Sequence, residues 1–111
     1  MSKGRRTKAT NIPPEVKKRV EERDSIDGTP VCIFCGSPNA RGEAHVIARS
    51  QGGLGVEENL VTVCRMCHSA MDNSQARELY VARAKEYLKS IYPNWNEQDL
   101  IYNKWKDFKY Q

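Results

Sequence analysis

Hydrophobic residues recur at helical spacing most clearly between residues 74 and 92. They follow the i, i+3, i+4 spacing of one helix face, after the helix-capping residues Asn73 and Ser74 and before Pro93, which ends a helix. The positions are Ala76, Leu79, Tyr80, Ala84, Tyr87, Leu88 and Ile91. This pattern predicts one helix over the whole stretch.

Two other stretches have weaker helical patterns. Residues 14–24 begin with a proline and an acidic residue in the first turn, and Val16 and Val20 form a thin apolar face. Asn96 can cap a last helix that continues toward the C-terminus. Its apolar face would hold Leu100, Ile101, Trp105 and Phe108. We therefore predict a helix near each end of the chain.

The middle of the chain alternates short β-prone runs with turn residues. Residues 44–47 and 60–63 are typical of short strands, whereas residues 27–30 and the glycine-rich residues 50–55 are typical of turns and loops. The second run leads into Cys64–His68, which opens a helix. The sequence therefore predicts a small α+β fold.

The composition limits what a hydrophobic core can contribute to stability. The chain has 111 residues, enough for one small domain, and 39% of them are hydrophobic while 29% are charged. A chain of this size buries a smaller share of its surface than a larger protein, so we expect an additional source of stability. The four cysteines are the candidates for it.

Positive charge is concentrated at the N-terminus. Of the 18 basic residues, 4 lie among the first ten positions, and the other 14 balance the 14 acidic residues of the chain. These four are Lys3, Arg5, Arg6 and Lys8. We interpret residues 1–12 as a basic, flexible arm. It either contacts a polyanion such as DNA, with release of counterions, or is simply a solvated terminus.

The sequence contains no membrane signal. No apolar run approaches the roughly 18 residues that a membrane span needs, and no apolar signal-peptide core follows the basic start. We expect a soluble, cytoplasmic protein without a membrane partner. Because the cytoplasm is reducing, its cysteines are better suited to binding a metal than to forming disulfides.

The cysteines form two C-x2-C pairs. Cys32 and Cys35 make the first pair, 28 residues intervene, and Cys64 and Cys67 make the second. Two such knuckles supply the four thiolates of a tetrahedral zinc site. Two disulfides or an iron–sulfur cluster are the alternatives. A four-thiolate zinc site has no open position, so we predict a structural ion.

The two histidines of the chain lie inside or beside this cysteine framework. The order is His45, Asn59, His68, and Asp72 follows His68 by four residues. On a helix, an imidazole and a carboxylate at this spacing share a face and can hold one divalent ion with positions open for water and phosphate. The alternative is that His68 packs against the zinc knuckle while Asp72 is an exposed helix residue.

Four segments together carry a resemblance to a known family. They are Cys32-x2-Cys35, the run from Ala44 to Gly53 (AHVIARSQGG), Glu58-Asn59-Leu60 and Cys64-x2-Cys67-His68. Over about residues 16–73 they resemble the HNH endonucleases, and among these the small four-cysteine type of bacteriophages and prophages. The resemblance implies a ββα-metal core, flanked here by an N-terminal helix and C-terminal helices.

The resemblance also implies roles for residues of this chain. His45 would be the general base that activates water, and Asn59 would orient His45 or assist the metal. His68 would bind the catalytic Mg²⁺ or Mn²⁺, with Asp72 as a second ligand by similarity to related nucleases. Arg49 is a candidate to clamp a neighbouring DNA phosphate, while the zinc stays structural.

Position 44 departs from the family pattern. Many family members have aspartate or histidine as a metal ligand immediately before the first histidine, whereas this chain has Ala44. Glu43 or water could fill the coordination place, the ion could sit on His68, Asp72 and substrate oxygens, or metal affinity could be poor.

Taken together, the sequence predicts a metal-dependent DNA endonuclease that nicks or cuts both strands. Residues 13–92 would form the nuclease domain with its zinc and flanking helices, and residues 93–111 a C-terminal helix packed on the same domain. The partners would be DNA and phage packaging proteins, with the chain a monomer or homodimer. The alternatives are an inactive zinc-ribbon module that binds nucleic acid in a packaging or recombination complex, or a scaffold that contacts another protein.

Overall fold

The computed structural model describes residues 5–103. The elements, with η marking a 3-10 helix, are α1 Arg5–Thr10, α2 Pro14–Arg23, β1 Ser25–Ile26, β2 Thr29–Pro30, β3 Ala40–His45, η1 Arg49–Gln51, η2 Glu57–Asn59, β4 Leu60–Cys64, α3 Arg65–Asn73, α4 Arg77–Ile91 and η3 Glu97–Leu100. In this part of the chain, no helix has the length and apolar character needed to cross a membrane. The fold is a small α+β fold, as the sequence predicts.

Helix α2 forms where the sequence predicts it. Pro14 occupies the first turn, where a missing N–H costs nothing, and Glu15 follows at the positive end of the helix. The helix buries Val16 and Val20, which are 8% and 0% exposed. These two side chains pack with Leu60 in a small core cluster that fixes α2 against β4.

A tight hairpin links α2 to the first cysteine pair. Strands β1 and β2 pair antiparallel around Asp27 and Gly28, whose φ angles are 51° and 82°. Two positive φ angles suit the turn that matches the twist of a hairpin. The turn predicted at residues 27–30 is confirmed.

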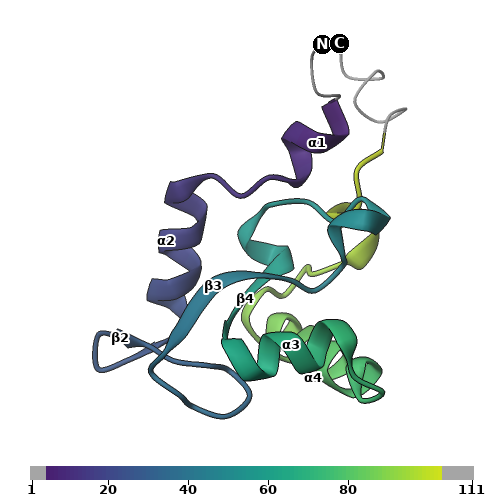
Figure 1. Cartoon of the computed structure of the whole chain (residues 1–111). Helices are drawn as coiled ribbons and strands as arrows, with labels where there is room; N and C mark the ends of the chain where they lie inside the picture. Colours follow the sequence, from purple (N-terminus) through teal and green to yellow (C-terminus); the bar gives the residue numbers. More distant parts are fainter. Residues whose placement is uncertain (1–4, 104–111) are drawn as a thin grey trace.

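Strands β3 and β4 form the central antiparallel hairpin. Ala44 lies opposite Val61 and His45 opposite Leu60, but β3 has one extra residue between Arg41 and Ala44. This β-bulge bends the strand and changes the direction of the side chains after it. Figure 1 shows α2 on one side of the hairpin and α3 with α4 on the other.

The core lies on both sides of β4. All five residues of β4 are buried, which is the pattern of a strand covered on both faces. The larger core cluster lies toward α3 and α4, and it includes the buried residues Ala44, Val46, Val61, Val63, Met71, Ala84 and Leu88. The cysteines Cys32, Cys64 and Cys67 belong to the same cluster, so the candidate zinc site is continuous with the core.

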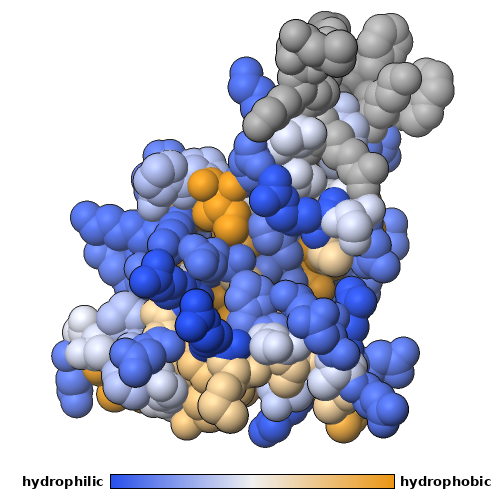
Figure 2. Space-filling model, viewed as in Figure 1, coloured by the Kyte–Doolittle hydropathy of each residue, from blue (hydrophilic) through white to orange (hydrophobic). Residues whose placement is uncertain are grey.

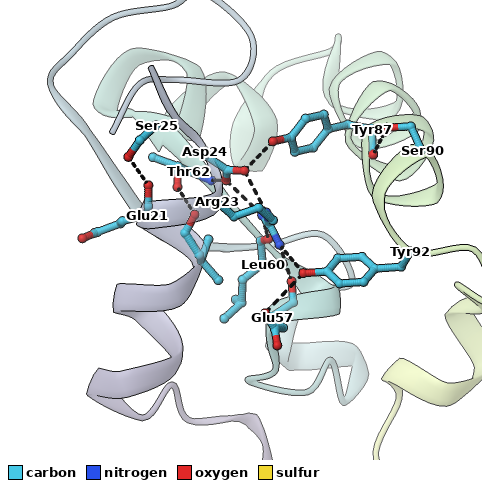
Figure 3. A network of polar contacts seen from close by, with 11 residues as sticks. Glu21, Arg23, Asp24, Ser25, Glu57, Leu60, Thr62, Tyr87, Ser90 and Tyr92 are labelled. Atoms are coloured by element: carbon cyan, nitrogen blue, oxygen red, sulfur yellow. Dashed lines mark hydrogen bonds and ion pairs between the residues drawn. The ribbon is translucent and has the colours of Figure 1, made fainter. Parts of the chain in front are cut away.

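A buried polar network joins α2, β4 and α4, as Figure 3 shows. The Arg23 guanidinium donates two hydrogen bonds to the Asp24 carboxylate, at 2.8 and 2.9 Å. Asp24 also accepts from the Thr62 backbone N–H at 3.0 Å and from the Tyr87 hydroxyl. Burial, with the neighbouring Asp24 carboxylate, raises the pKa of Tyr87 to about 12. The network therefore ties α2 to β4 and α4 through the paired charges of Arg23 and Asp24.

The C-terminal part differs from the sequence prediction. Asn96 does act as a cap, since its side chain accepts from the Gln98 N–H at 2.9 Å, but the helix that follows is only η3, Glu97–Leu100. Ile101 instead forms a β-bridge with Gly53. Tertiary pairing thus overrides helix propensity here, and Trp105 and Phe108 lie outside the described residues.

Three other boundaries differ from the prediction. The long helix predicted from residue 74 begins at Arg77, because the Ser74 hydroxyl caps the end of α3 by donating to the Ala70 carbonyl at 2.6 Å. Only Ala44 and His45 of the strand predicted at 44–47 belong to β3, which begins at Ala40 and whose earlier half is hidden in the sequence by its polar residues and bulge. The arm predicted as flexible contains α1, and the Ala9 carbonyl of this helix accepts a hydrogen bond from the Gly55 N–H at 3.0 Å.

Candidate active site

The four cysteines converge at the junction of β2, β4 and α3. Gly36, with φ 79°, closes the first knuckle by donating its N–H to the Cys32 carbonyl at 2.9 Å. In the second knuckle Cys64 caps α3, because its Sγ accepts from the Cys67 N–H at 3.4 Å. All four Sγ atoms lie within 4.8 Å of one another, and those of Cys35 and Cys64 are 3.6 Å apart.

This geometry fits a single metal ion. Sulfurs bound at about 2.3 Å to one tetrahedral zinc ion are about 3.8 Å apart. The four cysteines are free thiols rather than disulfides, and only Cys35 is exposed. Burial acts to raise the pKa of the Cys32 thiol, but backbone hydrogen bonds from Cys64, Cys35 and Phe34 outweigh it and lower the pKa to about 7. Cys32 is therefore the thiol that ionises readily to the metal-binding form, whereas burial and the neighbouring thiols raise the pKa of Cys67.

A separate cavity lies beside the hairpin, and both histidines line it. Its volume is about 420 Å³. His45 reaches it from the end of β3, while His68 and Asp72 reach it from α3. His68 Nε2 lies 3.4 Å from Asp72 Oδ2, so the pair predicted from the i, i+4 spacing is formed. The hairpin and helix thus bring to one cavity the titratable side chains that the sequence singled out.

His45 is held by the backbone of the N-terminal segment. Its Nε2 lies 3.0 Å from the Thr10 carbonyl oxygen. A carbonyl can only accept, so Nε2 carries the proton and Nδ1 keeps a lone pair when the ring is neutral. Burial is the main cause that lowers the pKa of His45 below its usual value of 6.5, and the charges of Arg49 and His68 lower it further. The Thr10 carbonyl and Asp72 act in the opposite direction but do not outweigh these effects. The ring is therefore neutral at pH 7 and can accept a proton.

Comparison with known proteins gives one match for this arrangement. Residues 32–80 match the sequence model of the family described as HNH endonuclease. These residues form an HNH domain. The matched range contains both cysteine pairs, both histidines, Asn59 and Asp72, whereas α1, α2 and most of α4 lie outside it. No curated protein and no solved structure matches the chain.

Asn59 of the HNH domain is fully buried, and its side chain forms hydrogen bonds with backbone groups. Its Oδ1 accepts from the Ile47 N–H at 2.9 Å, and its Nδ2 donates to the carbonyls of Ile47 and Leu54 at 3.2 and 2.9 Å. Its own carbonyl accepts from the Val46 N–H at 2.9 Å. The side chain therefore fixes the loop that leaves His45, whereas the family resemblance implies that it orients His45 or assists the metal directly.

Position 44 of the HNH domain faces the core. Ala44 is 0% exposed and belongs to the larger core cluster, so alanine is the residue that the packing accommodates. Glu43, next to it in the bulge, lines the histidine cavity and is ion-paired with Lys17 at 3.3 Å. Among the residues that the structure describes, one group of three or more His, Cys, Asp or Glu side chains has its ligand atoms within 4.8 Å of one another, and this group is the four cysteines. Glu43 is thus near His68 and Asp72 without joining them in a compact ligand set.

Several arginines surround the histidine cavity. A second cavity, of about 960 Å³, adjoins the first and shares Glu43, His68 and Asp72 with it. Arg49 and Arg77 line the first cavity, and Arg41 and Arg65 line the second. Arg49, the arginine predicted from the sequence, also contacts the Asn11 side chain. Figure 2 shows that the surface on one side of the molecule is mainly hydrophilic, with hydrophobic residues in small separate areas.

Sequence reasoning missed two parts of this site. No sequence motif marks the arginines Arg41, Arg65 and Arg77. Only the register of β3 and the orientation of α3 and α4 bring them to the groove that the two adjoining cavities form. The Thr10 carbonyl has no side-chain signal at all. Of the predicted basic arm, Lys8 is exposed on α1 and Lys3 lies outside the described residues, while Arg5 and Arg6 begin α1.

Proposed function

We propose that the protein is a metal-dependent DNA endonuclease that hydrolyses phosphodiester bonds. The observation that carries the proposal is the meeting, in one cavity of an HNH domain, of a neutral His45 with the His68–Asp72 pair. Phosphodiester hydrolysis needs a base for water and neutralisation of charge on the phosphate. These residues supply both.

His45 acts as the general base in this proposal. Its Nε2 proton is engaged by the Thr10 carbonyl, which leaves Nδ1 to accept a proton from water. Because burial keeps the pKa of His45 below 6.5, the base is in its neutral form at physiological pH. Asn59 supports this geometry by holding the backbone directly after His45.

His68 and Asp72 would hold the divalent ion. Their facing atoms, Nε2 and Oδ2, are close enough to share one ion, and the exposed carboxylate leaves room for water and phosphate oxygens. When bound, Mg²⁺ or Mn²⁺ supplies charge neutralisation for the scissile phosphate and the leaving oxygen. Glu43 and water remain the candidates for a further ligand in place of Ala44.

DNA is the substrate in this proposal because the groove combines an acidic centre with basic flanks. Glu43 and Asp72 mark the centre, while the arginines lie on the two sides of it. Arginine is well suited to phosphate oxygens, and each contact releases counterions from DNA. Basic residues of the N-terminal segment, Lys8 among those described, would extend this contact.

The four cysteines would hold one structural zinc ion. The sulfurs are placed for a closed tetrahedral site, which has no position for a substrate. The ion would stabilise the junction of the first knuckle with α3, the helix that carries His68. The phage type, packaging partners, oligomeric state and cytoplasmic location stay predictions.

The proposal is tested by incubating the zinc-bound protein with supercoiled plasmid and added Mg²⁺ or Mn²⁺, with a chelator of divalent ions as the control. We expect nicked or linear DNA only when the ion is present. A folded protein that shifts the plasmid in a gel but leaves it intact with every divalent ion would instead be a nucleic-acid-binding module.

A further inference from the structure

The segment Ala9–Ile12 lies outside the matched HNH domain but packs on the candidate active site. It begins within α1 and ends just before α2, so it contains most of the connection between these two helices (Figure 1). Thr10 is only 4% exposed, and Ile12 lines the histidine cavity. This placement contrasts with the flexible arm that composition suggests.

Three polar contacts hold the segment in place. The Thr10 carbonyl accepts from His45 Nε2 at 3.0 Å, and the Ala9 carbonyl accepts from the Gly55 N–H at 3.0 Å. The Asn11 side chain accepts a hydrogen bond from Arg49. The segment is therefore fixed on both sides of the carbonyl that contacts His45.

We propose that Ala9–Ile12 is a positioning element of the active site, and that its Thr10 carbonyl sets the orientation of the His45 ring for catalysis. This inference rests on the proposed nuclease function. It assigns a catalytic requirement to a part of the chain that precedes the HNH domain. The element acts through His45 and does not itself touch the reacting atoms.

The contact with the Thr10 carbonyl restricts rotation of the His45 imidazole ring. A histidine at the end of a strand can rotate about its side-chain bonds unless one ring nitrogen is anchored. With Nε2 anchored, Nδ1 has one direction in which to accept a proton, and misplacement of a base by about 1 Å can cost about 100-fold in rate. The buried position of Thr10 keeps water from replacing its carbonyl as the acceptor.

Gly55 offers a way to move the segment without touching His45. A Cβ at Gly55 would lie 1.9 Å from the Asn11 carbonyl oxygen and 2.6 Å from its carbonyl carbon. Gly55 has no left-handed φ, so alanine is compatible with its own backbone conformation. Gly55→Ala therefore pushes the segment away through crowding alone.

The experiment compares the wild-type full chain with Gly55→Ala and with Ala84→Gly. Ala84 is buried in α4 and belongs to a different core cluster from Ile12, so Ala84→Gly controls for a loss of stability. Proton–nitrogen NMR of protein labelled at its two histidines reports whether the His45 Nε2 proton is protected from exchange with water. Single-turnover plasmid cleavage reports the rate, and the His45→Ala spectrum assigns the signal.

We expect a protected Nε2 proton in the wild type and in Ala84→Gly. In Gly55→Ala the proton should exchange rapidly and the cleavage rate should fall at least about tenfold. A rate within about twofold of the wild type in Gly55→Ala, with the proton lost, would overturn the inference while leaving the nuclease intact. A protected proton in a wild type that cleaves no DNA would instead overturn the proposed function.

Asn11→Ala serves as the second variant if Gly55→Ala does not fold. It removes the contact with Arg49 and leaves the backbone free of steric conflict. We expect faster exchange of the His45 Nε2 proton and a smaller fall in rate in the same direction. An unchanged proton together with an unchanged rate would contradict the anchoring role of the segment.

Discussion

His68 and Asp72 face each other across one turn of α3, with the imidazole Nε2 3.4 Å from the carboxylate Oδ2. Both side chains are partly exposed, at 36% and 57%, so the pair contributes little to stability as an ion pair. The pair matters instead for its place, because it lines the same cavity as His45. In the proposed function these two side chains would be ligands of the divalent ion, and they would leave its other positions to water and substrate.

Asp72→Asn should separate metal binding from folding. The amide keeps the size of the side chain but removes the charge, so we expect weaker Mg²⁺ or Mn²⁺ binding and a cleavage rate at least about tenfold lower. Titration calorimetry with Mn²⁺ and single-turnover cleavage measure the two effects. Glu86→Gln is the matched control, because Glu86 is an exposed carboxylate on α4 that lines neither cavity. Equal metal affinity in Asp72→Asn and wild type would remove Asp72 from the site.

The pH dependence of cleavage should report His45. Because the pKa of His45 lies below 6.5, the neutral base is lost only as the pH falls below that value. We expect more than half of the plateau rate to remain at pH 6.5, with the midpoint of the acid limb lower. Single-turnover rates across about pH 5 to 9 measure this. A midpoint above 6.5 would contradict the assignment.

The lowered pKa of His45 also makes the free energy of unfolding depend on pH. This dependence provides a check on the pH profile of cleavage. Since the pKa of His45 is lower in the folded than in the unfolded chain, protonation favours unfolding as the pH falls below 6.5. Thermal unfolding at each pH therefore distinguishes loss of the base from loss of the fold. Above pH 6.5 this contribution to stability is fully present.

Removal of the cysteine-bound metal should unfold the domain. Cys67→Ser takes away one of four ligands at the start of α3, so we expect loss of bound zinc and a large fall in the melting temperature. Metal analysis and circular dichroism measure these effects, with Met66→Ala as the control because Met66 is an adjacent residue that is 82% exposed. Full stability after chelation, or mass spectra that show two disulfides, would contradict a zinc site.

The arginines of the second cavity should contribute to DNA affinity through phosphate contacts. For Arg41→Gln combined with Arg65→Gln we expect the slope of log affinity against log salt to fall by about one for each charge removed. Arg83→Gln is the matched control, since Arg83 is exposed on α4 and lines neither cavity. Fluorescence anisotropy without divalent ions measures binding alone. Equal slopes in the double variant and the control would exclude this groove as the DNA path.

Local signals explain which parts of the fold the sequence could predict. Pro14 at a helix start, Asp27-Gly28 in a turn and the two C-x2-C knuckles act within a few residues, and the structure contains each of them. The i, i+4 spacing of His68 and Asp72 also follows from helix geometry alone. These features depend little on the rest of the chain.

Long-range contacts explain what the sequence could not predict. Ile101 pairs with Gly53, so the helix expected after Asn96 ends early. The Thr10 carbonyl contacts His45 across 35 positions of sequence, and a backbone group leaves no trace in composition or motif. The contacts of Asn59 with backbone groups likewise depend on how the loop after His45 closes, which the sequence does not reveal.

The most direct test of the account is single-turnover cleavage of supercoiled plasmid by the wild type and His45→Ala, each with zinc bound and Mg²⁺ or Mn²⁺ added. We expect the wild type to cleave and the variant to lose at least about 100-fold in rate, with DNA affinity and zinc content unchanged. Cleavage by His45→Ala at the rate of the wild type would contradict the assignment of His45 as the base.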